Sequence, residues 1–397
     1  MPAWPPDATP TLDAPTARDL RTPAWITLAA VAIGLQLVLY RYSGYSWHFF
    51  AEAAALLIGQ HPPGDVLAGG LHLYAHYPQL QFGPLTVLAS VLLLPLSDGG
   101  WFLVTWFMTL SGLLVLFVLD RTVRLLRPDI DPNDWRTVGT MVFGGISFLI
   151  SWELLAVHFG HLDDVLALML LAVAMAAAAD RAPILTGLSL GLAVDAKPWA
   201  LACAAVLLVF PLRQMWKPAL VAGAVICVAW LPFVLGDPHT LGAAASFTIP
   251  NSPASALRAL GVGSATTPPW DRAAQIGIGC LLGAIAVLRR RFVAVVALGI
   301  GSRIVLDPSV FSYYTAGLAL GVLLWDLVGY RRPAPRLSLL CLVGLTLAPV
   351  VVRNSHLLGE LRLWTVVVAA VVMLVLPREA RASQARLLDG DRTQPIG

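Results

Sequence analysis

The densest group of residues able to do chemistry is the run HFGHLDD, from His158 to Asp164. Adjacent carboxylates point in different directions on a helix, so one can face a cavity while the other caps the helix N-terminus. Helix capping alone would account for Asp163, because the helix dipole favours an acid in the first turn. It accounts less well for Asp164, and His161 lies close to both acids in the sequence. We therefore expect Asp163 and Asp164 to be catalytic and His161 to bind substrate.

The same run could instead hold a divalent metal ion, because imidazole nitrogens and carboxylate oxygens are both common metal ligands. A site that handles phosphate can also work with Lys and Arg side chains alone. The sequence therefore requires no metal and no other cofactor.

A second group interrupts the apolar run GLSLGLAVDAKPWALACAAVLLVF with Asp195 and Lys197. Ionisable side chains in membrane segments are costly, and they usually face a cavity or a partner. In one interpretation Lys197 reaches the lipid headgroups or pairs with Asp195. In the other, its ammonium group meets the phosphate of a lipid-linked substrate.

The third group is the segment RIVLDPSVFSYY, from Arg303 to Tyr314. A pair between Arg303 and Asp307 is one interpretation of it. The other gives Arg303 a bidentate contact with phosphate oxygens. Tyr313 or Tyr314 would then contact a sugar or an isoprenoid chain.

The chain has the composition of an integral membrane protein. Of its 397 residues, 58% are hydrophobic and 12% are charged, whereas a soluble domain has about 25% charged residues. The basic residues form no stripe along a soluble element, which argues against a nucleic-acid partner. No two of the four cysteines have the spacing of a metal site.

Apolar runs recur along the whole chain, and a run of about 17 residues is the practical minimum for a span. We expect an all-α polytopic bundle of about 12 spans over residues 23–377, between a disordered cytoplasmic tail at 1–22 and a cytoplasmic tail at 378–397. The expected spans are 24–40, 101–119, 137–152, 163–179, 182–196, 198–212, 218–235, 273–288, 292–306, 311–328, 337–352 and 362–376.

The charged residues between these runs are of two kinds that alternate along the chain. One kind is almost purely basic, and short cytoplasmic loops are enriched in Lys and Arg. The other kind, which we call mixed, combines acids with His, Lys or Arg, as in Asp195 with Lys197 and Arg303 with Asp307. If the apolar run 82–96 is interfacial or re-entrant rather than a span, every basic cluster falls in the cytoplasm and the mixed clusters gather outside. The basic positions are Arg121, Arg124, Arg127, Arg181, Arg213, Lys217, Arg289, Arg290, Arg291, Arg331, Arg332, Arg336 and Arg378.

Two long outer loops are expected to contribute to the site. In the first, over 41–100, residues 47–59 predict a short amphipathic helix, with Glu52 off its apolar face. The second, over 236–272, is rich in Pro, Ser, Gly and Thr and contains Asn251 and Arg258. We expect both of these residues to bind substrate.

The motifs quoted above, together with GPLTVL in the first outer loop and ADRAPILTGLSLGLAVDAKPWA, resemble a known family. The chain is similar to the polyprenol-phosphate-sugar-dependent membrane glycosyltransferases of the C-type fold. It is most similar to actinobacterial mannosyltransferases that act outside the inner membrane. The likeness extends over residues 24–330 and implies a helical bundle with a lipid-facing groove and an active site made by outer loops.

One departure from the family concerns the general base. Enzymes of this family typically have an acid in the first outer loop, soon after the first span, and the segment YRYSGYSWH has none. The nearest candidates are His48, Glu52 and Asp65. A histidine suits a base near neutral pH, and Glu52 could itself act or could orient His48.

The expected function is transfer of a hexose, with mannose the expected sugar, from a polyprenyl phosphate to a lipid or cell-envelope glycan. The reaction would take place on the outer side of the cytoplasmic membrane. Two other classes fit the sequence: a transporter or lipid flippase, in which Lys197 and Arg303 would line a pathway, and a non-catalytic subunit of an envelope-assembly complex.

Overall fold

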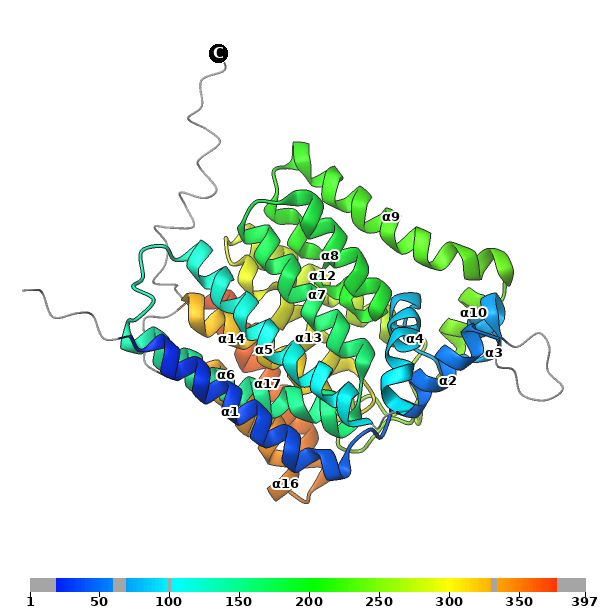
Figure 1. Cartoon of the computed structure of the whole chain (residues 1–397), viewed down its shortest axis with the longest axis horizontal. Helices are drawn as coiled ribbons and strands as arrows, with labels where there is room; N and C mark the ends of the chain where they lie inside the picture. Colours follow the sequence, from blue (N-terminus) through cyan, green and yellow to red (C-terminus); the bar gives the residue numbers. More distant parts are fainter. Residues whose placement is uncertain (1–18, 60–68, 99–100, 330–333, 377–397) are drawn as a thin grey trace, which may run out of the picture.

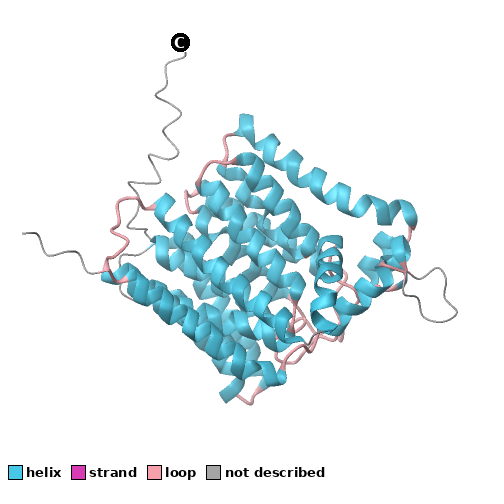
Figure 2. Cartoon of the chain, viewed as in Figure 1, coloured by secondary structure: helices cyan, strands magenta, loops and turns pink. Residues whose placement is uncertain are grey.

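The computed structural model describes residues 19–59, 69–98, 101–329 and 334–376, and all regular elements in these ranges are helices (Figure 2). One isolated antiparallel bridge joins Pro250 to Thr266. The expected all-α class is confirmed. Asp65, Arg331, Arg332, Arg378 and most of the two expected tails lie outside the described residues.

Each segment expected to span the membrane overlaps helical residues. Most observed helix ends lie within a few residues of the expected ones, but α5 ends seven residues later and α17 begins seven residues earlier than expected. The α-helices are α1 (Arg21–Leu39), α2 (Trp47–Leu57), α3 (Leu73–His76), α4 (Pro84–Asp98), α5 (Trp101–Leu126), α6 (Trp135–Glu153), α7 (Leu162–Ala179), α8 (Pro183–Ala196), α9 (Leu212–Gly236), α10 (Thr240–Ser246), α11 (Ala256–Ala259), α12 (Asp271–Leu288), α13 (Val295–Leu306), α14 (Thr315–Gly329), α15 (Arg336–Cys341), α16 (Ala348–Val351) and α17 (Ser355–Val375). The 3₁₀-helices are η1 (Tyr40–Tyr42), η2 (Gly70–His72), η4 (Pro198–Val209), η5 (Phe292–Ala294) and η6 (Ser312–Tyr314), and the π-helices are η3 (Leu154–Phe159) and η7 (Leu342–Leu347).

In the described part of the chain, 7 helices are long and apolar enough to cross a membrane. They are Arg21–Tyr42, Trp101–Leu126, Trp135–Phe159, Leu162–Ala179, Leu212–Gly236, Asp271–Leu288 and Ser355–Val375. Shorter apolar helices, among them α8, η4 and α14, pack between these. The protein is therefore a polytopic helical membrane protein.

The bundle has a buried centre and an apolar outer surface. In α7, 83% of the apolar window is buried inside the protein, against 11% in α9. In Figure 1, α1 and α9 run along two outer edges, and α7 lies among its neighbours. Large apolar side chains such as Val228 and Leu288 are exposed on the outside. A surface of this kind suits lipid, because a water-exposed apolar patch of that extent is unusual.

The helix η4 is a long 3₁₀-helix of 12 residues, although such runs seldom exceed about four residues. Side chains three residues apart eclipse one another in this geometry. Ala200, Cys203, Val206 and Val209 share that spacing and are all buried. One row of buried side chains in η4 therefore follows a period of three.

The purely basic positions that the structure describes gather at one end of the bundle, which we call the basic end. It contains the N-terminus of α1 and the C-termini of α5, α7, α12, α14 and α17. The contacts that show this are Arg21 with Asp120, Arg121 with Asp180 (3.7 Å), Arg127 with the carbonyl of Val328 (3.0 Å) and Arg291 with the carbonyl of Met373 (2.7 Å).

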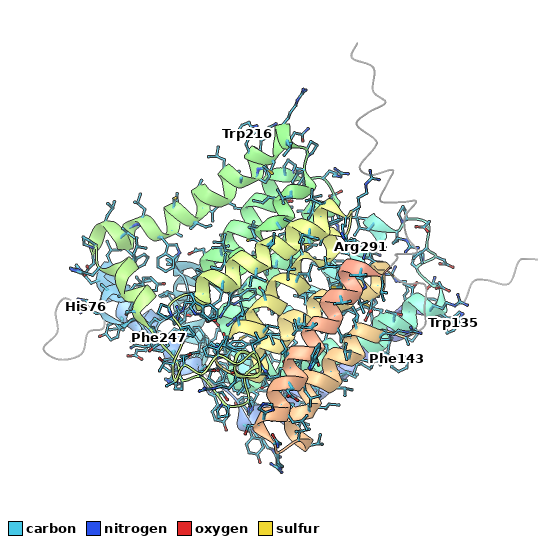
Figure 3. The ribbon with its side chains drawn as sticks, turned by 180° about the vertical axis from the view of Figure 1, so that it is seen from behind. His76, Trp135, Phe143, Trp216, Phe247 and Arg291 are labelled. Carbon is cyan, nitrogen blue, oxygen red and sulfur yellow. The ribbon has the colours of Figure 1, made fainter. Side chains whose placement is uncertain are left out.

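The opposite end holds the mixed charges, and we call it the mixed end. Seen from behind in Figure 3, Arg291 and Trp216 lie on one side of the molecule, and His76 and Phe247 lie on the other. Asp163 and Asp164 lie in the first turn of α7, and the C-terminus of α7 is at the basic end, so the two kinds of charge that alternate in the sequence are separated in space.

Both ends of α4 lie at the mixed end. The Gly83 N–H donates to the carbonyl of Ala196 at 3.0 Å, next to Lys197. After α4, α5 begins at Trp101, whose indole donates to the Ser43 hydroxyl in the first outer loop. Because α4 is one continuous helix, having both ends here means that it lies along the mixed end and does not cross the bundle.

Candidate functional site

The centre of the candidate site is an ion pair between the start of α7 and the corner after α8. The Lys197 ammonium donates to Oδ2 of Asp163, a carboxylate that is almost completely buried. The other oxygen of Asp163 accepts from the backbone N–H of Asp164 at 2.8 Å. Asp195 does not pair with Lys197, because its carboxylate is buried against Gly83.

Asp164 is held by two donors on a single oxygen. Its Oδ1 accepts from the Trp199 indole at 2.7 Å and from the Arg303 guanidinium at 3.2 Å. Its Oδ2 is buried and has no hydrogen-bond partner among the described residues. A buried carboxylate oxygen without a hydrogen bond is costly. Asp164 Oδ2 shares this state with Oδ1 of Asp195, and Nδ1 of His161 lies 4.0 Å from it.

Aromatic rings fix the guanidinium of Arg303. Its central carbon lies 4.0 Å from the ring centroid of Tyr314 and 5.0 Å from that of Trp199. Its Nε lies 3.9 Å from the Asp307 carboxylate. The pair with Asp307 that the sequence suggested is therefore present, and Arg303 also reaches Asp164; its contact with a phosphate stays a prediction.

His161 joins the first outer loop to the acids. Its Nε2 lies 3.0 Å from the Ser46 hydroxyl, and its Nδ1 lies 3.3 Å from Oδ1 of Asp163. Its ring stacks on Tyr313, with centroids 3.8 Å apart. The side chains of His161 and Lys197 are each 13% exposed, so these two residues form the open rim above the buried acids.

Two further arginines lie near Asp307. Arg362 is buried and donates to the Val310 carbonyl at 3.4 Å. Arg272, which donates to the Phe247 carbonyl, also interacts electrostatically with Asp307. Burial raises the pKa of the Asp307 carboxyl, while Arg303 and Arg362 act in the opposite direction. The site thus has more positive charge than its sequence motifs suggest.

The acids and His161 are close enough to consider as a metal site. One ligand atom from each of His161, Asp163 and Asp164 lies within 4.8 Å of the others. Lys197 and Arg303 already neutralise the two carboxylates. A divalent cation would have to displace one of these side chains, so the donor set fits an ion poorly.

The structure does not bring His48 and Glu52 into this cluster. Helix α2 forms over Trp47–Leu57, as the sequence predicted, and buries Trp47 and Phe50. His48 and Glu52 are exposed, and neither forms a hydrogen bond or ion pair with a described residue of the cluster. They differ in this respect from Ser46, which does contact His161.

Asn251 and Arg258 brace the second outer loop. The Asn251 amide donates to the carbonyls of Val262 and Ser264, and Arg258 donates to the carbonyl of Asn251 at 3.3 Å. The loop reaches the site through its backbone, because the Ser252 N–H donates to the Pro308 carbonyl at 2.8 Å. Both side chains therefore have structural partners, and no hydrogen bond joins either of them to the acids in the described residues.

Sequence reasoning did not single out Trp199, Arg272 or Arg362. Trp199 follows Lys197-Pro198 directly, so its place in a corner with a charged residue was a usable signal. Arg272 and Arg362 lie at or beside the first residue of an expected span, at its outer end. An arginine there could have been recognised as part of the same charged layer.

An apolar groove lies beside the charged layer, between α12, α13 and α17. It encloses about 250 Å³. Its residues near the mixed end include Leu260, Leu306 and Val366. Leu306 precedes Asp307, and Val366 is one helical turn from Arg362. The groove therefore begins next to the buried arginines.

Together these groups offer anion-binding cations, a carboxylate oxygen of Asp164 that accepts no hydrogen bond in the described residues, aromatic surfaces and an adjoining apolar groove. The arrangement can bind a phosphate, hold a hydroxyl group and accommodate a lipid chain. No protein-family model matches the sequence, and no curated protein matches it.

Proposed function

We propose that the chain is an integral-membrane glycosyltransferase that moves a hexose, with mannose the expected sugar, from a polyprenyl-phosphate donor to a lipid or cell-envelope glycan. The observation that supports this most strongly is the buried network in which Asp163 binds Lys197 and Asp164 binds Arg303. Buried ionisable groups in a membrane protein are functional candidates because they are costly to keep.

Transfer breaks the bond between the anomeric carbon and the phosphate oxygen, and that electron pair stays on the phosphate. The acceptor oxygen forms the new bond to the anomeric carbon and loses its proton to a base. Negative charge on the leaving phosphate needs cations that are already in position. Lys197 on the rim and Arg303, fixed between two rings, supply them.

We assign the base to Asp164. Its Oδ2 forms no hydrogen bond in the described residues and lies 4.0 Å from Nδ1 of His161. A base must come within hydrogen-bond reach of the proton that it accepts. Trp199 and Arg303 hold Oδ1 and so orient Oδ2. His48 and Glu52 then have no direct role, because they lie on the exposed side of α2.

The donor's isoprenoid chain would enter the apolar groove between α12, α13 and α17. The groove begins near Asp307 and Arg362 and continues away from the charges. A donor bound this way has its phosphate near the arginines and its tail among Leu and Val side chains. That division matches the two chemical halves of a lipid phosphate.

The topology that we propose has about 12 spans, with α4 as an interfacial helix rather than a span, because both of its ends lie at the same end of the bundle. The Lys- and Arg-rich basic end then faces the cytoplasm. The mixed end and its active site face the periplasm or cell exterior of a plasma-membrane protein.

A transfer assay tests the proposal. Protein in liposomes would receive polyprenyl-phosphate-mannose with a radiolabelled sugar, together with a cell-envelope lipid extract as acceptor. We expect label in the acceptor lipids and a loss of about 10²–10³-fold in rate for Asp164→Asn and for Lys197→Met. His48→Ala and Glu52→Ala are the matched controls and should retain the wild-type rate within about threefold.

Equal transfer by wild type and both site variants would refute the assignment of the site. No transfer by any protein, accompanied by counterflow of the lipid phosphate across the bilayer, would indicate the transporter class instead.

A further inference from the structure

Two arginines at the basic end have a backbone conformation that normally favours glycine. Arg181 has φ 58° and Arg290 has φ 60°, and they are the two non-glycine residues with positive φ in the described part of the chain. A side chain in this region is disfavoured, because Cβ crowds the following carbonyl oxygen. Such an outlier is a reason to look for a function of the side chain.

Both arginines occupy the same position in the same turn. The N–H of Arg181 donates to the carbonyl of Ala178, and the next N–H, of Ala182, donates to that of Ala177. After α12, Arg290 donates to Val287 in the same way, and the following residue donates to Ala286. These are Schellman turns, in which the residue with positive φ is usually glycine. The fold therefore has Arg twice at a position that glycine would fill without strain.

The two turns meet at one cavity. It encloses about 240 Å³ at the ends of α5, α7, η4 and α12, and both Arg181 and Arg290 line it. The rest of the lining is apolar, including Leu126, Ala179 and Phe292. Leu208 and Leu288 line it as well and are 37% and 81% exposed. The cavity therefore opens on the outer, lipid-facing flank of the bundle.

We infer that this cavity binds an anionic phospholipid, with an acyl chain inside and the headgroup phosphate on Arg181 and Arg290. The apolar lining suits a hydrocarbon chain, and arginine suits phosphate oxygens. Arg289 and Arg291 flank Arg290 in the chain, and Asp180 precedes Arg181. Asp180 lies 3.7 Å from Arg121, so this acid already has an arginine beside it. Basic pockets between helices on the cytoplasmic side are suited to acidic headgroups.

The strained turns distinguish this site from an ordinary basic loop. A loop that only set orientation could place its arginines at unstrained positions, and glycine would serve the turns better. The structure instead places two arginines in the lining of one apolar cavity, from the turns after two separate helices. The site is independent of the proposed glycosyl transfer, because it lies at the opposite end of the bundle.

The test is lipid binding by the double variant Arg181→Gly/Arg290→Gly. Glycine suits both turns, so the variant should fold, and its thermal midpoint without lipid should equal or exceed that of wild type. Native mass spectrometry from an uncharged detergent would measure binding of phosphatidylglycerol and of phosphatidylcholine. We expect wild type to retain phosphatidylglycerol selectively and the double variant to bind it at least tenfold more weakly.

Arg213→Ala/Lys217→Ala is the matched control, since it removes the same charge from the same end, outside the cavity lining. It should bind phosphatidylglycerol as wild type does. Ala179→Leu narrows the cavity without changing charge and should weaken binding.

Three results would overturn the proposal. One is wild-type affinity in the double glycine variant, and the second is equal retention of phosphatidylcholine. The third is stabilisation by inorganic phosphate that matches that by phosphatidylglycerol, which would indicate a site for a free anion.

Discussion

Lys197 donates to Asp163 across 34 positions of sequence, although Asp195 lies only two residues away. The pair ties the corner between α8 and η4 to the first turn of α7. Helix α7 is the most buried of the long apolar helices in the described part of the chain. The pair therefore fixes the first turn of this central helix to a neighbouring element. The same contact determines where the ammonium group lies relative to Asp164 and His161.

Replacing one partner of this pair should lower the free energy of unfolding more than replacing both. Lys197→Met leaves Asp163 charged and buried, which should lower the free energy of unfolding by about 3–5 kcal/mol. The double variant Asp163→Asn/Lys197→Met has no unpaired charge and should recover most of that loss. Its Asn oxygen can still accept from the Asp164 N–H. Unfolding in mixed micelles would measure the free energy of unfolding of the single and the double variant. A double variant as unstable as the single one would contradict the prediction.

Arg303 should not be replaceable by lysine. Arg303→Lys keeps the charge but loses the planar group that lies over Tyr314 and bonds Asp164. If Arg303 binds the donor phosphate, kcat/KM for the donor should fall by about 10²-fold. Arg258→Lys is the control, because Arg258 bonds a loop carbonyl, and its kcat/KM should be near that of wild type. Equal effects of the two substitutions would remove Arg303 from the site.

The contact between α4 and α8 depends on Gly83. A methyl group at Gly83 would overlap the backbone carbonyl of Asp195, and a backbone carbonyl cannot move aside as a flexible side chain can. Gly83→Ala should therefore destabilise the protein by at least about 1–3 kcal/mol. Gly34 lies within α1, and a methyl group there meets nothing within 4 Å. Gly34→Ala should be neutral or add about 0.5–1 kcal/mol, and equal melting of the two variants would count against this packing.

The exposed turn after α9 should lose protection in acid. Asp237 accepts from the His239 N–H at 2.9 Å and lies 3.2 Å from His72 Nδ1. These contacts, the His239 amide first, lower the pKa of Asp237 from 3.8 to about 2. A lowered pKa means that the stabilisation is complete above pH 3.8 and is lost as the pH falls through about 2.

Hydrogen exchange of the His239 amide, corrected for its intrinsic rate, measures the loss of its hydrogen bond to Asp237 as the pH falls. Wild type should be protected at pH 5 and unprotected near pH 2. Asp237→Asn should show no change over that interval, and a wild-type amide still protected at pH 2 would be incompatible with the assignment.

The positions of the helices could be predicted because a long apolar run in a membrane protein indicates a helix over the same residues. Every expected span overlaps a helix, α2 appears where amphipathic spacing placed it, and the two kinds of charge separate to opposite ends. The chemistry-bearing groups around Asp163, Lys197 and Arg303 also come together. The number of spans and their orientation remain predictions.

The pairings inside the site could not be predicted from the sequence. Proximity along the chain favoured Asp195 as the partner of Lys197, but helix packing brings Asp163 to it. Asn251 has loop carbonyls as partners because a loop rich in Pro and Gly must satisfy its backbone groups with side chains. Contacts of this kind depend on how separate helices pack, which periodicity does not encode.

The winding of η4 changes how far a short segment reaches. Its 12 residues rise about 2.0 Å each in a 3₁₀-helix and extend about 24 Å. The same residues would extend only about 18 Å as an α-helix. A hydrocarbon core is about 30 Å thick. If Pro198–Val209 is a span, as proposed, the tighter winding takes it across most of that thickness with fewer residues than an α-helix would need.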